Sequence, residues 1–91
     1  MDEPIELPID GVLDLHTFTP REVKDLVPDY LAECPKRGIF QVRIIHGKGT
    51  GALRRAIRNA IKDNPVVKSF ETGQEGEGGD GVTVIKLNNG E

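Results

Sequence analysis

Two histidines and an aspartate occupy positions from which a proton could be transferred. Asp14 and His16 are separated by one residue in the segment VLDLH, and His46 opens the segment HGKGTG. Histidine titrates near neutral pH, and a neighbouring carboxylate can orient the imidazole ring and raise its basicity. Asp14 and His16 therefore form a candidate pair for general acid–base catalysis, and His46 is a candidate second proton carrier.

Two other interpretations of these three residues stay open from the sequence. Asp-x-His arises often by chance, so His16 could instead be a structural histidine that bonds the backbone at the end of a strand. Asp14, His16 and His46 could also hold a metal ion together, but three ligands without a cysteine match no established signature. We therefore predict no metal site.

A glycine-rich turn lies directly before a strongly basic segment. The glycines of HGKGTG permit positive φ and a close backbone approach, and the helix predicted after them directs its free N–H groups outward. Residues 43–62 contain basic side chains and no acidic one, although the whole chain has a formal net charge of −3. This pattern predicts a site that approaches the phosphates of a polymer.

Plainer explanations exist for the turn and for the charge. The glycines could serve only a tight strand-to-helix connection, and a run of charge is usually a solvated surface. Acids are favoured in the first turn of a helix by the helix dipole, so their absence after this turn favours an external anion. A nucleotide triphosphate is a poorer match, because neither GxxxxGK[ST] nor GxGxxG is present at this turn.

The first strand must position the Asp-x-His pair. In GVLDLH, at 11–16, Leu13 and Leu15 alternate with Asp14 and His16. Successive side chains of a strand point to opposite faces, so the apolar pair and the polar pair lie on different faces.

Three further strands are expected. FQVRIIH, at 40–46, is rich in β-branched residues and ends at the second histidine. The segments 66–71 and 81–87 have the same character, and a polar loop that we expect to be mobile, 72–80, joins them as an antiparallel pair.

Helical patterns fill the two stretches between the first three strands. Thr19, Pro20 and Glu22 have the types and spacing of an N-cap, a first helical residue and a capping box. Pro28 lacks an N–H, so we expect a kink or a second segment there. The second helix follows the glycine-rich turn with a regular apolar stripe, and it stops before Asn64-Pro65.

The predicted order is βαβαββ, which gives a two-layer α/β sandwich. Successive right-handed crossovers place both helices on one face of a four-stranded mixed sheet. Ligands of such sheets gather at the carboxyl ends of the strands. We therefore expect Asp14, both histidines and the glycine-rich turn to meet at one edge.

Length and composition predict one domain. We assign an extended arm to 1–10, the domain to 11–88 and a tail to 89–91. Cys34 is the only cysteine, which excludes an internal disulfide and a cysteine-rich zinc site. The sequence has no signal-peptide pattern and no apolar run of membrane-spanning length. We expect a cytoplasmic monomer without a membrane partner.

Three segments together resemble the Smr, or small MutS-related, domain family: LDLHTF at 13–18, IIHGKGTGALR at 44–54 and GGDGVTVIKL at 78–87. The resemblance implies the same βαβαββ fold, which is similar to the C-terminal domain of translation initiation factor three. It also implies nicking or cleavage of DNA or RNA. In some branches of the family, the substrate is messenger RNA on stalled ribosomes.

The resemblance also implies roles for individual residues. Asp14 and His16 match the Asp-x-His assigned to cleavage, and His46 opens the turn assigned to nucleic-acid contact. Gly81 and Thr83 match the third motif. The residues that we expect to hold phosphates are Gly47, Lys48, Gly49, Thr50, Gly51, Arg54, Arg55 and Arg58.

One departure from the family pattern concerns Thr17, which stands where the family generally has glycine. Threonine does not adopt positive φ cheaply and adds a side chain at the edge of the site. Three functions therefore remain from the sequence, the last of which is a purely protein-interaction domain. The first is an endonuclease on structured DNA or RNA, for which a DNA substrate would favour a divalent ion such as magnesium. The alternative is a non-catalytic module that binds nucleic acid or the ribosome.

Overall fold

In the described part of the chain, four strands and two helices follow one another in the predicted order, βαβαββ. The computed structural model describes residues 9–47, 51–73 and 79–88. The helices and strands are β1 (Val12–Asp14), α1 (Pro20–Glu33), β2 (Gln41–Ile45), α2 (Ala52–Ile61), β3 (Val67–Thr72) and β4 (Val82–Leu87). The predicted arm, loop and tail fall largely outside the described residues.

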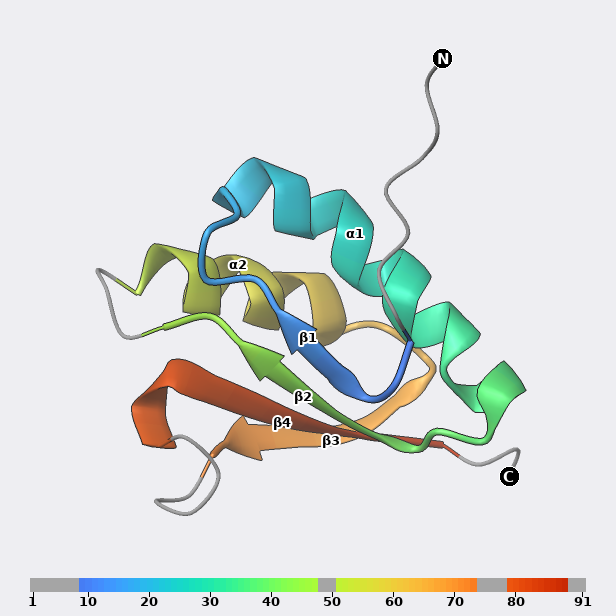
Figure 1. Ribbon diagram of the computed structural model, residues 1–91. Helices are drawn as coiled ribbons and strands as arrows, with labels where there is room; N and C mark the ends of the chain where they lie inside the picture. The colour runs from blue at the N-terminus through green and yellow to red at the C-terminus, as the bar shows by residue number, and fades with distance from the viewer. Residues whose placement is uncertain (1–8, 48–50, 74–78, 89–91) are drawn as a thin grey trace.

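The strands form one mixed sheet in the order β1-β2-β4-β3. β1 and β2 are parallel, and β4 is antiparallel to both of its neighbours, β2 and β3. α1 and α2 pack against each other on one side of this sheet (Figure 1). The predicted two-layer sandwich and the predicted antiparallel pairing of the last two strands are both confirmed.

The capping box predicted for α1 is present. The Thr19 hydroxyl accepts the Glu22 amide at 3.3 Å, and the Glu22 carboxylate accepts the Thr19 amide at 2.9 Å. The expected second segment after Pro28 is wrong, because α1 continues through Pro28 to Glu33. A short 3₁₀ turn and Gly38, whose φ is 76°, then end it. No helix in the described part of the chain has the length and apolar character needed to cross a membrane.

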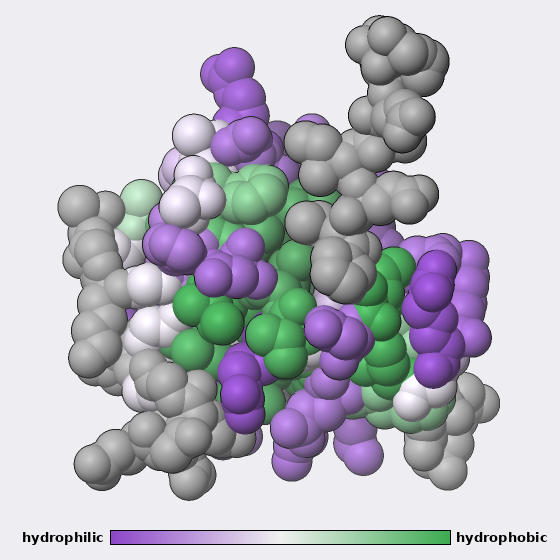
Figure 2. Space-filling model, viewed as in Figure 1, coloured by the Kyte–Doolittle hydropathy of each residue, from purple (hydrophilic) through white to green (hydrophobic). Residues whose placement is uncertain are grey.

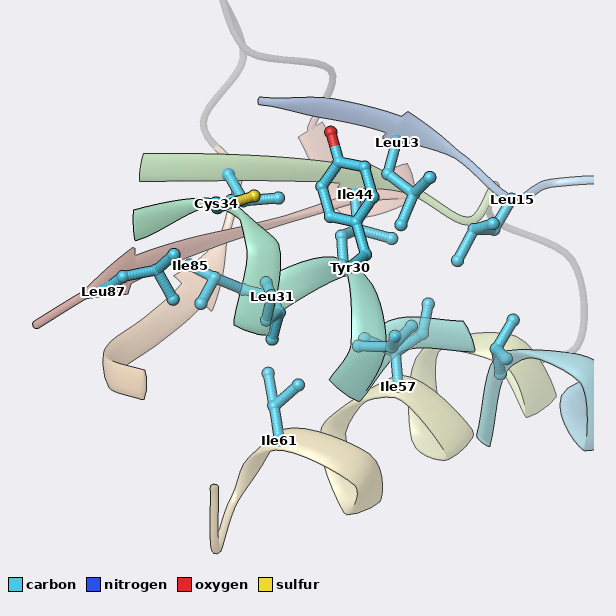
Figure 3. Packing of buried hydrophobic residues seen from close by; sticks show 13 residues of the cluster. Leu13, Leu15, Tyr30, Leu31, Cys34, Ile44, Ile57, Ile61, Ile85 and Leu87 are labelled. Carbon is cyan, nitrogen blue, oxygen red and sulfur yellow. The ribbon is translucent and has the colours of Figure 1, made fainter. Parts of the chain in front are cut away.

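The core lies between the helices and one face of the sheet. Leu31 of α1 and Ile57 of α2 point toward Ile44 and Ile85 of the central strands (Figure 3), and all four side chains are fully buried. Tyr30 adds a polar contact at the edge of this core, because its hydroxyl accepts the buried Gly11 amide at 3.1 Å. That hydrogen bond ties α1 to the residue before β1.

The other face of the sheet is only partly apolar. The pairing register places Val12, Arg43, Val84 and Glu71 in one row across the four strands. Figure 2 shows apolar atoms in a band over β1 and β2, bordered by hydrophilic ones. Phe40, the residue before β2, is 38% exposed.

We predict that Tyr30→Phe lowers the free energy of unfolding by about 1–3 kcal/mol. The ring volume is kept, but the buried Gly11 amide loses its acceptor, and an unsatisfied buried donor costs about that much. Urea denaturation followed by circular dichroism measures the change. An unchanged midpoint would show that the Gly11 amide finds another partner.

Candidate functional site

β1 ends at Asp14, two residues before the end of the strand predicted at 11–16. The Asp14–His16 pair forms where the strand ends. The Leu15 amide still donates to Ile45 of β2, at 2.7 Å, but the His16 amide turns back to the Asp14 carboxylate at 3.1 Å. The His16 Nδ1 lies 2.5 Å from the same oxygen, Oδ1. A local Asp turn thus replaces the last residues of the expected strand and fixes the imidazole.

The pair is exposed and electrostatically matched. The side chains of His16 and Asp14 are 57% and 52% exposed. The hydrogen bond from the His16 ring, followed by that from the His16 backbone, lowers the pKa of Asp14 below its ordinary value. The carboxylate is therefore ionised near neutral pH and holds the imidazole proton on Nδ1. Nε2 is left as the nitrogen that can accept or donate a proton.

His46 is in the opposite situation, being only 4% exposed. Its Nδ1 lies 2.9 Å from the Gly47 carbonyl, and its Nε2 lies 2.9 Å from the Thr83 hydroxyl. A carbonyl can only accept, so Nδ1 carries the proton and the Thr83 hydroxyl donates to Nε2 in the neutral ring. Burial lowers the pKa of His46 below 6.5, and this keeps the ring neutral. Both ring nitrogens are bonded within the chain.

The turn after β2 is fastened to the start of β4. The Gly81 carbonyl accepts the amides of His46 and Gly47 at 2.9 and 3.0 Å. Gly47 has φ of 78°, and a Cβ built on it would lie 3.7 Å from the His16 Cβ. The turn therefore passes directly beside His16. The Gly47 amide thus already donates to the Gly81 carbonyl.

The two histidines and the start of α2 line one cavity. Its volume is about 330 Å³, and its lining residues are His16, His46, Gly47, Gly51, Ala52, Leu53 and Arg54. Gly51, with φ of 86°, is the N-cap of α2, whose first turn contains no acid. The predicted meeting of both histidines with the glycine-rich turn is confirmed. Lys48, Gly49 and Thr50 lie outside the described residues.

A second hollow continues from this cavity along α2. Its volume is about 320 Å³, and it is lined by Gly51, Arg54, Arg55, Arg58 and Asn59. Gly51 and Arg54 border both spaces, so the two are adjoining. Asn59 was not expected from the sequence, although its helical spacing from Arg55 would place it on the same face.

Arg58 differs from the other two arginines of this hollow. Its Nη2 donates to the Thr72 hydroxyl at 2.8 Å, and its guanidinium lies 5.5 Å from the centre of the Phe70 ring. Burial lowers its pKa. Arg58 is thus half-buried against β3 and fastens α2 to the sheet, whereas Arg54 and Arg55 have no such anchor among the described contacts.

The three side chains weighed as metal ligands from the sequence all lie in the described part of the chain. Within the ranges that the structure describes, no three His, Cys, Asp or Glu side chains are grouped as metal ligands. His46 in particular has both nitrogens bonded to Gly47 and Thr83, so it offers no lone pair to an ion.

Comparison with known proteins gives consistent results along most of the chain. A family model described as the Smr domain matches residues 13–88. Two relatives named endonuclease MutS2, from Caldicellulosiruptor saccharolyticus and Symbiobacterium thermophilum, are 46% and 48% identical over 82 and 75 residues. These matches cover 90% and 82% of this chain but only 10% of each relative. The chain thus spans about a tenth of the length of these relatives.

Two solved structures share the fold. The Smr domain of Thermus thermophilus MutS2 has a TM-score of 0.81 and 43% identity, and the match covers 87% of this chain and 99% of that one. YdaL, a stand-alone small MutS-related protein from Escherichia coli, has a TM-score of 0.78 and 23% identity, covering 85% and 63% of the two chains. The second likeness concerns the fold alone.

We predict that His46 makes stability depend on pH near neutrality. Burial lowers the pKa of His46 in the folded chain below its value in the unfolded chain, so the unfolded chain takes up a proton first as the pH falls. The free energy of unfolding therefore decreases as the pH falls through the ordinary histidine range. Urea titrations at pH 7.5 and 5.5 measure this, with ring NMR to identify the Nδ1–H tautomer. His46→Gln should show a smaller difference between the two pH values, and an equal difference would contradict the assignment.

We also predict that Thr83→Val loosens the turn. The variant keeps the side-chain shape but removes the donor to buried Nε2 of His46, at a cost of about 1–3 kcal/mol. Denaturant unfolding measures that cost, and faster hydrogen exchange of the Gly47 amide reports the turn itself. Thr72→Val is the matched control, because it removes a hydroxyl from half-buried Arg58 on the same sheet and should leave Gly47 exchange unchanged.

Proposed function

Because the chain belongs to the Smr domain family, we propose that it binds nucleic acid and cleaves a phosphodiester bond, with His16 as the residue that transfers the proton. The observation that carries this proposal is the exposed Asp14–His16 pair beside the cavity at the start of α2. The carboxylate fixes the ring through Nδ1, and Nε2 would exchange a proton with the substrate. The relatives named endonuclease MutS2 support the same chemistry.

The cavity and the adjoining hollow would hold the phosphates. Arg54 borders both spaces and Arg55 is exposed beside it. The acid-free first turn of α2 adds the positive end of a helix dipole, which attracts anions. Phosphate contact is therefore assigned to these arginines and to the start of α2. Arg58 would act indirectly, by holding α2 against β3.

The Asp14–His16 pair could cleave an RNA substrate without a metal ion. His16 Nε2 would take the proton of a 2′-hydroxyl while that oxygen forms a bond to phosphorus. The bond from phosphorus to the 5′-oxygen of the next nucleotide breaks, and that oxygen takes up a proton from the protonated ring. The products are a 2′,3′-cyclic phosphate and a 5′-hydroxyl. DNA lacks the 2′-hydroxyl, so water would attack, and a divalent ion such as magnesium would be more useful.

His46 takes a different role in this proposal from the proton transfer expected from the sequence. Proton transfer would require it to break a bond to Thr83 or Gly47, both of which hold the turn. We assign His46 the positioning of the turn beside His16. The reaction then has one exchanging ring, and that ring both receives and returns the proton.

A binding module without cleavage is the second candidate, and Thr17 favours it. This exposed residue follows the Asp14–His16 pair at the position where the family generally has glycine. In this candidate, the added side chain would obstruct the approach of the substrate. The basic surface of α2 would still bind nucleic acid, including that of a ribosome.

We predict that His16→Ala lowers the cleavage rate by about 10²–10⁴-fold, the usual contribution of a general acid–base residue. Asp14→Asn should lower it by a smaller factor, because the amide cannot stabilise the charged ring. End-labelled structured RNA and supercoiled plasmid, each with magnesium and with EDTA, are the substrates. Thr17→Gly is the matched variant at the adjoining position and should cleave at least as well as wild type.

Binding is measured in parallel to separate the two candidates. Neither His16→Ala nor Asp14→Asn should weaken binding, and log affinity should fall with log salt by about 0.9 per phosphate neutralised on duplex DNA. If wild type binds without cleaving and Thr17→Gly cleaves, the wild-type chain is a binding module. An affinity for nucleic acid that does not change with salt concentration would contradict both candidate functions.

A further inference from the structure

A third cavity lies in the groove between α1 and α2. Its volume is about 470 Å³, larger than the cavity beside the histidines or the hollow of the arginines. Its lining residues are Pro20, Lys24, Pro28, Ala56, Asn59 and Ala60. The site described above does not use this groove, although the two helices that form it are the ones that cover the sheet (Figure 1).

The sequence explains why the groove is open. α1 presents residues 20, 24 and 28, one turn apart on the same face, and α2 presents two alanines opposite them. The larger side chains Val27 and Ile57 point below the groove and are fully buried in the core. The short alanine side chains and the proline rings therefore leave an apolar slot between the outer faces of the helices.

The groove also carries polar groups suited to a flat ligand. Asn59 offers an amide that both donates and accepts, and Lys24 offers an ammonium group. Pro28 has no N–H, so the helical hydrogen bond to the Lys24 carbonyl is missing. An apolar slot with a few such groups at its rim is the usual form of a small-ligand site.

The groove is continuous with the basic surface beside the histidines. Asn59 lines both the groove and the hollow of Arg54 and Arg55, and Gly51 joins that hollow to the His16 cavity. At 1.5 Å per residue, Asn59 lies about 12 Å along α2 from Gly51. A strand of stacked B-form DNA advances about 3.4 Å per nucleotide, and an unstacked strand advances farther, so this distance spans at most roughly three to four nucleotides.

We propose that the groove between α1 and α2 binds an unpaired base of the nucleic acid whose phosphates follow the arginines of α2. The substrate then has a single-stranded segment a few nucleotides from the bond at His16. The proposal rests on the proposed function. The proline rings and alanines contact the faces of the base, and Asn59 and Lys24 meet its polar edge. A base in a duplex is stacked and paired, so only an unpaired base can enter.

The groove lining favours this occupant over an acidic peptide. The residues that line the groove and the basic hollow include no acid, which suits a polyanion in general. The slot is apolar between its prolines and alanines, however, and a base offers a flat apolar face together with a charged backbone. The basic hollow takes that backbone at the same time, since Asn59 belongs to both spaces.

The test compares a labelled single-stranded oligonucleotide with a blunt duplex of the same sequence, by fluorescence anisotropy. The Lys24→Ala/Asn59→Ala variant should bind the single strand roughly tenfold more weakly, the scale of one base contact. Its affinity for the duplex, whose phosphates would still meet Arg54 and Arg55, should fall by a clearly smaller factor. Lys36→Ala is the matched control, an exposed lysine after α1 that pairs with Glu33 and should change neither affinity.

An abasic scan distinguishes base binding from loss of charge. A single abasic nucleotide, moved along the strand, should weaken wild-type binding most at one position and should weaken the variant no further there. Equal losses on single strand and duplex would overturn the proposal, since Lys24 would then be only a phosphate contact. Unchanged affinity in the variant would also overturn it while leaving the proposed function intact. Wild-type protein that binds neither nucleic acid would defeat the proposed function itself.

Discussion

The site depends on one set of hydrogen bonds between the end of β2 and the start of β4. The Gly81 carbonyl accepts two successive amides, and the Thr83 hydroxyl holds the His46 ring, whose Nδ1 in turn holds the Gly47 carbonyl. Because these bonds are buried, losing a partner costs more than an exposed bond would. They fix the direction in which the chain leaves the sheet, and so the place where α2 begins and where the turn meets His16.

Local signals made much of the fold predictable. The capping box at Thr19 and the alternation around Asp14 involve residues within three or four positions, and such patterns can be read directly from a single chain. The boundary of β1 was less predictable, because the side chain of Asp14 competes with the ladder for the His16 amide. The hydrophobic pattern predicts the face of the sheet on which a residue lies, but it does not predict whether a side chain or the sheet ladder accepts the His16 amide.

The roles of the second histidine and of Arg58 could not be predicted in the same way. Their partners, Thr83 and Thr72, lie 37 and 14 residues away along the chain. A sequence gives the type of a residue but not which distant hydroxyl it will meet. Spacing therefore grouped Arg58 with Arg54 and Arg55 of α2. Only the sheet register shows that Thr72 and Thr83 are neighbours on the face toward the helices.

The difference in exposure between the two histidines then decides their chemistry. A ring that transfers a proton must keep one nitrogen open to its substrate, and His16 does so because Asp14 occupies the other. His46 is buried and would have to give up a structural bond to take part. The same exclusion applies to the Gly47 amide, which Gly81 already occupies. In the proposed function, phosphate is therefore held farther along, at the start of α2 and by Arg54 and Arg55, and a strand held there would extend toward the groove beside α1.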